Sequence, residues 1–226
     1  MTRRWALPEQ VDVKDVLRRS VALVRASDVA LAYGGIIVGV AVILAVVPTS
    51  IRDEVVLRSS TNLANLHEHP IYVLIISAFV VANLLGLVVV PFLMVAYAAA
   101  QHWLGRLGAI VAGVFGHVGA TLFVATLLIA GIKDHVVSRS VAFESDVGVS
   151  YGLAAVAGML AARVVPRWRS WYVAGLVVYF VGPLFVLRTF TGVGHTTALA
   201  IGFALAWIAH RAGRPAAPGE GQNAPS

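Results

Sequence analysis

The chain has 226 residues, of which 59% are hydrophobic and 12% are charged, and its mean hydropathy is +0.84. Soluble domains hold roughly 25% charged and 45–50% apolar residues, so this composition excludes an ordinary soluble domain and indicates a polytopic membrane protein. The absence of cysteine excludes disulfide bonds, thiolate metal sites and a cysteine nucleophile. The net charge of +6 is distributed among the loops, so orientation in a membrane explains it better than nucleic-acid binding.

The two ends of the chain are polar. In residues 1–27, basic residues are interspersed with apolar ones at a spacing that predicts a short amphipathic helix on the inner leaflet, and a solvated cytoplasmic leader is the alternative. Residues 212–226 are rich in Pro, Ala and Gly, which predicts a disordered cytoplasmic tail. Residues 28–211 between them are predicted to form one membrane domain.

The apolar stretches of this domain predict transmembrane helices, because a bilayer core about 30 Å thick needs roughly 20 apolar residues in a helix. Six spans are expected, at residues 29–48, 81–101, 109–131, 150–165, 172–187 and 195–210. Residues 71–81, before the second span, are expected to be partly loop or to re-enter the membrane. Most basic residues fall on the side of the two termini, which predicts an all-α bundle with both termini in the cytoplasm.

A candidate nucleophile lies at the start of the fourth predicted span. Ser150 stands between Gly148 and Gly152, and His195 begins the sixth span at the same outer face. A serine hydroxyl is a weak nucleophile until a base takes its proton, and a neutral imidazole suits that task. Gly148 and Gly152 lack side chains, so the helix start can approach a neighbour and a substrate backbone can approach Ser150. The first-turn amides, including those near Val149 and Ser150, lack intrahelical acceptors, so we expect them to donate hydrogen bonds to an oxyanion.

Structural interpretations of the same residues remain open. Small residues around Ser150 also permit close helix packing, and Ser150 itself is a suitable helix cap. A histidine at the end of a span is commonly an interfacial residue. The shared depth of Ser150 and His195 is the observation that favours a catalytic pair.

Several short motifs carry a resemblance to a known family. They are Ser77-Ala78-Phe79, Trp103-Leu104-Gly105, Gly148-Val149-Ser150, and Gly194-His195 with Gly202 two turns later. Over about residues 70–206 the chain resembles the rhomboid intramembrane serine proteases, and more closely a rhomboid-like branch of actinobacterial appearance. The resemblance implies a six-helix fold and a catalytic dyad that opens to the outside, with Ser150 as the nucleophile and His195 as the general base.

The chain also departs from the family pattern. The second span usually begins with a histidine and an asparagine that serve the oxyanion, whereas here Asn83 is the one candidate. Tyr151 replaces the usual glycine after the serine, and Ala154 replaces the tyrosine that usually packs under the histidine. Ala198 stands where a glycine is usual. These departures motivate the alternative of a catalytically inactive protein that binds transmembrane helices.

His117 lies inside the third predicted span. An intramembrane histidine indicates either a hydrogen bond to a neighbouring helix or a proton relay, and the second reading would fit a small transporter. Counted from the inner end, His117 lies roughly 13 Å deep, too far inward to touch Ser150. We assign His117 to helix packing together with Gly152 and Gly202.

The remaining predictions concern cofactors, partners and location. His67 and His69 flank an acidic residue but are expected to be solvated, so we predict no metal and no cofactor. The expected partners are the lipid bilayer and transmembrane protein substrates or clients. Binding to nucleic acid is not expected. The predicted location is a bacterial plasma membrane, which the chain crosses several times, with the active site facing outward.

Overall fold

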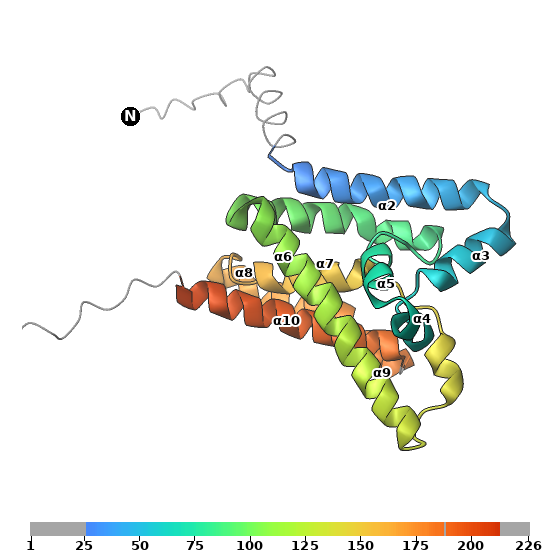
Figure 1. Ribbon diagram of the computed structural model, residues 1–226. Coiled ribbons are helices and arrows are strands. Elements are labelled where there is room, and N and C mark those ends of the chain that lie inside the picture. The colour runs from blue at the N-terminus through green and yellow to red at the C-terminus, as the bar shows by residue number, and fades with distance from the viewer. Residues whose placement is uncertain (1–25, 188, 213–226) are drawn as a thin grey trace, which may run out of the picture.

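The computed structural model describes residues 26–187 and 189–212. Residues 1–25 of the expected leader and 213–226 of the expected tail lie outside these ranges. The described part is helical (Figure 1). Its elements are α2 (Asp28–Val46), α3 (Thr49–Arg58), α4 (Leu63–Glu68), α5 (Pro70–Ile76), η1 (Leu84–Val88), α6 (Val89–Lys133), η2 (Arg139–Phe143), α7 (Val149–Leu160), α8 (Pro166–Phe180), α9 (Gly182–Leu187) and α10 (Phe190–Ala212).

Four helical segments of the described residues are long and apolar enough to cross a membrane. They are Asp28–Val46, Leu84–Lys133, Pro166–Leu187 and Phe190–Arg211. The protein is therefore a multi-pass membrane protein by length and composition of its helices. A fifth apolar helix, α7, is shorter than these four.

Helix α6 contains the second and third predicted spans. Gly105 interrupts it with φ 77° and ψ 176°, and Figure 1 shows a sharp bend between its two arms. Positive φ is accessible to glycine because it has no Cβ. The first arm, residues 89–104, runs alongside α2, and the second arm, residues 106–133, leads away toward η2 (Figure 1).

The segment before α6 differs from the predicted start of the second span. The helix begins at Val89 and not at residue 81, because a loop and the short η1 come first. The side chain of Asn83 accepts a hydrogen bond from the Gly86 amide at 3.1 Å and so caps η1. In the stretch 71–81, only α5 is helical, and it ends at Ile76.

Two other predicted helix boundaries were wrong, and Pro166 explains the start of α8 and why no helix continues through residue 165. The residue before a proline is disfavoured in the α region, and Val165 is extended with ψ 141°. Helix α7 ends at Leu160 and not at residue 165, and residues 161–163 continue as tighter turns with hydrogen bonds to the third residue before each. Proline is favoured at the first helical position, so α8 begins at Pro166 and not at residue 172.

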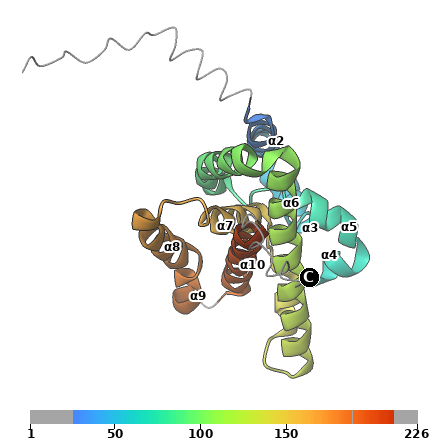
Figure 2. The same ribbon diagram turned by 90° about the vertical axis from the view of Figure 1, so that its left-hand side faces the viewer.

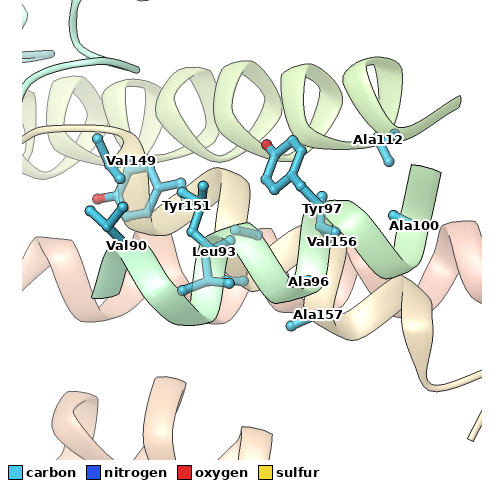
Figure 3. Close-up of a cluster of buried hydrophobic side chains, with 14 of the residues drawn as sticks. Val90, Leu93, Ala96, Tyr97, Ala100, Ala112, Val149, Tyr151, Val156 and Ala157 are labelled. Carbon is cyan, nitrogen blue, oxygen red and sulfur yellow. The ribbon is translucent and has the colours of Figure 1, made fainter. Parts of the chain in front are cut away.

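Helix α7 is the centre of the packed core. All of its residues except Ser150 and Leu160 are buried, and it lies among α6, α8 and α10 (Figure 2). Figure 3 shows Leu93 and Tyr97 of the first arm of α6 in the same buried cluster as Tyr151 of α7. In lipid, such helices associate mainly through van der Waals packing and hydrogen bonds.

Two glycines bring the neighbouring backbones against α7. A Cβ at Gly116 of α6 would overlap the side chain of Ala155, and a Cβ at Gly202 of α10 would overlap the Ala155 carbonyl oxygen. Helix α7 is thus held between α6 and α10 at a distance that leaves no space for a side chain on either glycine. This close packing fixes how the first turns of α7 and α10 face each other.

Candidate active site

Ser150 and His195 meet at one end of the packed core. Ser150 lies in the first turn of α7, and its Oγ is 2.8 Å from Nε2 of His195. The hydroxyl donates this hydrogen bond when Nε2 carries no proton. Helix α10 begins at Phe190, five residues earlier than predicted, so His195 lies in its second turn and not at its mouth. Both side chains are partly buried.

A pocket of about 490 Å³ gives access to these two residues. Its wall includes Asn83 from the loop before η1, Phe180 at the end of α8 and Thr191 from α10. Asn83 is exposed, its Oδ1 accepts from the Gly86 amide, and its Nδ2 has no acceptor among the described residues. The pocket therefore brings together a serine hydroxyl, an imidazole and a side-chain amide, and the wall is otherwise mainly apolar.

The backbone amides at the start of α7 differ in availability. The Gly148 amide donates to the Ser77 carbonyl oxygen at 3.0 Å, so it is already bonded within the protein. The amides of Val149 and Ser150 have no acceptor within the described part of the chain. These two N–H groups remain free at the first turn of a helix, where a negative charge is favoured.

An aromatic side chain that sequence reasoning had not assigned to the site supports His195. The ring of Tyr151 stands edge-on to the imidazole, with centroids 5.2 Å apart and an interplanar angle of 84°. The ring of Phe180, on α8, lies beside the imidazole, with the two ring centroids 5.7 Å apart. A Cβ at Gly194 would overlap the Tyr151 ring, so this glycine makes room for it. In the sequence, the one sign that Tyr151 belongs to the site was that it follows Ser150 directly and that a glycine, Gly194, directly precedes His195.

Asp146 is a second residue that sequence reasoning missed. It is 6% exposed, and its Oδ2 accepts a hydrogen bond of 2.6 Å from the Tyr151 hydroxyl. Thr191 donates to Oδ1 at 3.3 Å and Thr61 to Oδ2 at 3.4 Å. The Asp146 carbonyl accepts from the side chain of Ser60 and the amide of Thr61, each at 2.8 Å. One buried aspartate thus joins the loop before α4 to the starts of α7 and α10.

The family follows from a comparison with known proteins. Residues 22–215 match the family model described as rhomboid-like protein. The chain belongs to the rhomboid-like family. This family includes intramembrane serine proteases. No curated protein and no solved structure matches the chain significantly.

In this rhomboid-like chain, His117 packs against the segment that carries Ser150. Its Nε2 donates to the Leu74 carbonyl at 2.9 Å and lies 3.2 Å from Ser77 Oγ. A Cβ at Gly148 would overlap the His117 ring, so the imidazole packs against the residue that stands two positions before Ser150 in the chain. His117 therefore links α6 to α5, to Ser77 directly after α5, and to the start of α7.

The other predicted packing residue, Gly152, lies on the face of α7 that meets α6. A Cβ there would come within 3.0 Å of the Tyr97 hydroxyl. His67 and His69 belong to neither the pocket nor any group of three metal-ligating side chains among the described residues.

Asp146 gives a prediction for the pH dependence of stability. Burial raises the pKa of its carboxyl above the ordinary value of 3.8, although hydrogen bonds from Tyr151, Thr191 and Thr61 oppose the shift. The folded state therefore binds the proton more tightly, and this contribution to stability is full below 3.8 and is lost as the pH rises through the folded pKa. Asp146→Asn cannot lose a proton, so it should gain stability relative to the native protein across this window.

Thermal unfolding in detergent between about pH 4 and pH 8 measures this difference. Asp134→Asn is the matched control, because Asp134 is exposed at the end of α6. A stability difference that shrinks with rising pH would show that the folded state prefers the carboxylate of Asp146, contrary to this prediction.

Proposed function

We propose that the protein is an intramembrane serine protease that cleaves transmembrane protein substrates with Ser150 as the nucleophile and His195 as the general base. The hydrogen bond of 2.8 Å between their side chains is the observation that carries the proposal. A nucleophile within 2.6–3.2 Å of its base meets the geometric requirement for this chemistry. The pair also lies in an accessible pocket with free amide donors beside it.

The proposed reaction has two halves. Ser150 Oγ attacks the scissile carbonyl carbon while His195 Nε2 takes the hydroxyl proton, and the carbonyl oxygen becomes an oxyanion. The amides of Val149 and Ser150, with Nδ2 of Asn83, donate hydrogen bonds to this oxyanion. His195 then returns the proton to the leaving amine. A water molecule, deprotonated by the same imidazole, hydrolyses the acyl-enzyme and restores Ser150.

The surroundings of the pocket favour a transmembrane substrate. Its lining includes Asn83 and Gly86 from the segment before α6, and Tyr179, Phe180 and Pro183 from α8 and α9. Helices α8 and α9 are the least buried of the long apolar segments and stand apart along one side in Figure 2. A substrate segment must be unwound when it enters this pocket, because an intact helix would keep its carbonyls in its own hydrogen bonds.

The membrane arrangement is part of the same proposal. With the two arms of α6 counted separately, the chain crosses a bacterial plasma membrane six times with both termini in the cytoplasm. Helix α7 is about 18 Å long, shorter than the roughly 30 Å hydrocarbon core. Ser150 therefore lies below the outer surface, and the pocket admits water from outside.

The test is direct labelling of the nucleophile. Purified protein in detergent is treated with a fluorophosphonate, and the modified residue is identified by mass spectrometry. Modification of Ser150, together with cleavage of a reconstituted substrate containing a helix-destabilised transmembrane segment, is the expected result. A protein that neither reacts at Ser150 nor cleaves any of a panel of such segments is not this enzyme.

Asn83 provides a prediction about the oxyanion. Asn83→Asp keeps the oxygen that caps η1 but removes the Nδ2 donor, so we expect kcat to fall about 10²–10³-fold while the protein stays folded. Asn62→Asp is the matched control, because Asn62 caps α4 in the same way outside the pocket. Native kcat in Asn83→Asp would assign oxyanion stabilisation to the two backbone amides alone.

The second candidate is a catalytically inactive protein that binds transmembrane helices. The pocket lining favours it, since Asn83 is the one side chain with a hydrogen-bond donor that the loop before η1 contributes to the described wall, and this side chain is exposed. This candidate predicts that Ser150→Ala retains the cellular function at native abundance. A protease predicts loss of function in the same strain.

A further inference from the structure

The contacts around the Ser150–His195 pair extend to a buried carboxylate. We propose that Asp146 and Tyr151 are positioning residues that hold the His195 imidazole against Ser150, an inference that rests on the proposed protease function. The hydroxyl of Tyr151 donates to Asp146, and the ring of the same tyrosine stands against the imidazole. Asp146 therefore acts on His195 through Tyr151 and without touching it.

The first argument is the geometry at Tyr151. Its side chain is fully buried, and both of its ends are held: the hydroxyl by the 2.6 Å hydrogen bond to Asp146, and the ring by the edge-on contact with His195. A ring fixed in this way limits rotation of the imidazole about its side-chain bonds. Because a misplacement of about 1 Å lowers catalysis by up to roughly 100-fold, such a restraint affects rate.

The second argument is that Asp146 holds both helix ends that carry the pair. Tyr151 lies next to Ser150 on α7, and Thr191 lies one turn before His195 on α10. The two oxygens of one carboxylate accept from both residues. The relative position of the two helix starts is thus set by the same group that fixes the tyrosine ring.

The third argument is the character of the groups that face this carboxylate. They are Thr61 from the loop before α4, the backbone amide of Val147, Tyr151 from α7 and Thr191 from α10, and all are neutral donors. In the described ranges, no lysine, arginine or histidine forms an ion pair with Asp146. A buried acid without a cation is disfavoured on stability grounds, which is typical of groups retained for function.

The experiment compares variants that remove or keep the hydrogen bond. Tyr151→Phe keeps the ring and removes the hydroxyl, Asp146→Ala removes the acceptor, and Asp146→Asn keeps an oxygen that accepts from Tyr151. Tyr172→Phe is the matched control, because its hydroxyl donates to the Ala157 carbonyl at 2.7 Å near the other end of α7. The readouts are kcat and KM on a transmembrane substrate, the rate of fluorophosphonate labelling of Ser150, and thermal unfolding.

We expect kcat and the labelling rate to fall about 10–100-fold in Tyr151→Phe and in Asp146→Ala, with KM within about twofold of the native value. The double variant Asp146→Ala/Tyr151→Phe should be no slower than the slower single variant, because the two residues act as one unit. Asp146→Asn should restore most of the rate. The Tyr172→Phe control should keep native kcat with a comparable change in stability.

Different results would overturn different claims. Native kcat in Tyr151→Phe, additive losses in the double variant, or an Asp146→Asn variant as slow as Asp146→Ala would each overturn the positioning role while leaving the protease intact. Native protein that neither labels at Ser150 nor cleaves substrate would overturn the proposed function and this inference together. A variant that loses rate only in proportion to its unfolded fraction counts against positioning.

Discussion

Ser150→Ala is expected to abolish cleavage and labelling by fluorophosphonate. Removing the nucleophile of a serine protease lowers kcat about 10⁶-fold, which leaves no measurable product in a membrane assay. The variant should fold normally, because Ser150 is partly buried and its side chain bonds to His195 and to no other described group. Gel-based cleavage of a reconstituted substrate and thermal unfolding, measured on the same preparation, check both expectations.

Ser170→Ala is the matched control, since Ser170 is exposed on α8 and does not line the pocket. Its activity should equal that of the native protein. Labelling that persists in Ser150→Ala would assign the nucleophile to another residue. Ser77 is then the next to replace, because it also lies within hydrogen-bonding distance of a histidine, His117, although both are buried.

Gly202→Ala is expected to have the largest effect on the fold. The added Cβ would overlap the carbonyl oxygen of Ala155, which is backbone and has no rotamer to adopt instead. Overpacking of this kind costs about 1–3 kcal/mol. If α10 moves away from α7 by about 1 Å, the hydrogen bond between Ser150 and His195 lengthens and the labelling rate falls up to roughly 100-fold.

The matched control is Gly175→Ala on α8, where an added Cβ has no atom within 4 Å. Alanine favours helix over glycine, so this variant should be as stable as the native protein or slightly more stable. Thermal unfolding and the fluorophosphonate labelling rate of the two variants test the comparison. Equal behaviour of Gly202→Ala and Gly175→Ala would show that α7 and α10 do not depend on close backbone contact.

Local sequence was sufficient to predict much of the helical content. A long apolar run, such as the one that forms α2, predicts a membrane helix because the length and polarity of contiguous residues decide membrane insertion. Helix ends were less predictable. The start of α6 at Val89 depends on the cap that Asn83 provides to η1, whereas the effects of Pro166 on α7 and α8 were readable in the sequence and were underestimated.

The sequence by itself determined that this protein is an apolar, helical membrane protein with a Gly-flanked Ser150 and a His195 at the mouths of two segments. Only the tertiary structure decided that these side chains lie 2.8 Å apart, that Tyr151 supports the imidazole, and that the Gly148 amide is already bonded. Composition and motifs are properties of neighbouring residues in the chain. Contacts such as that between Asp146 and Thr191 join distant segments, so they exist only once α7 and α10 have packed together.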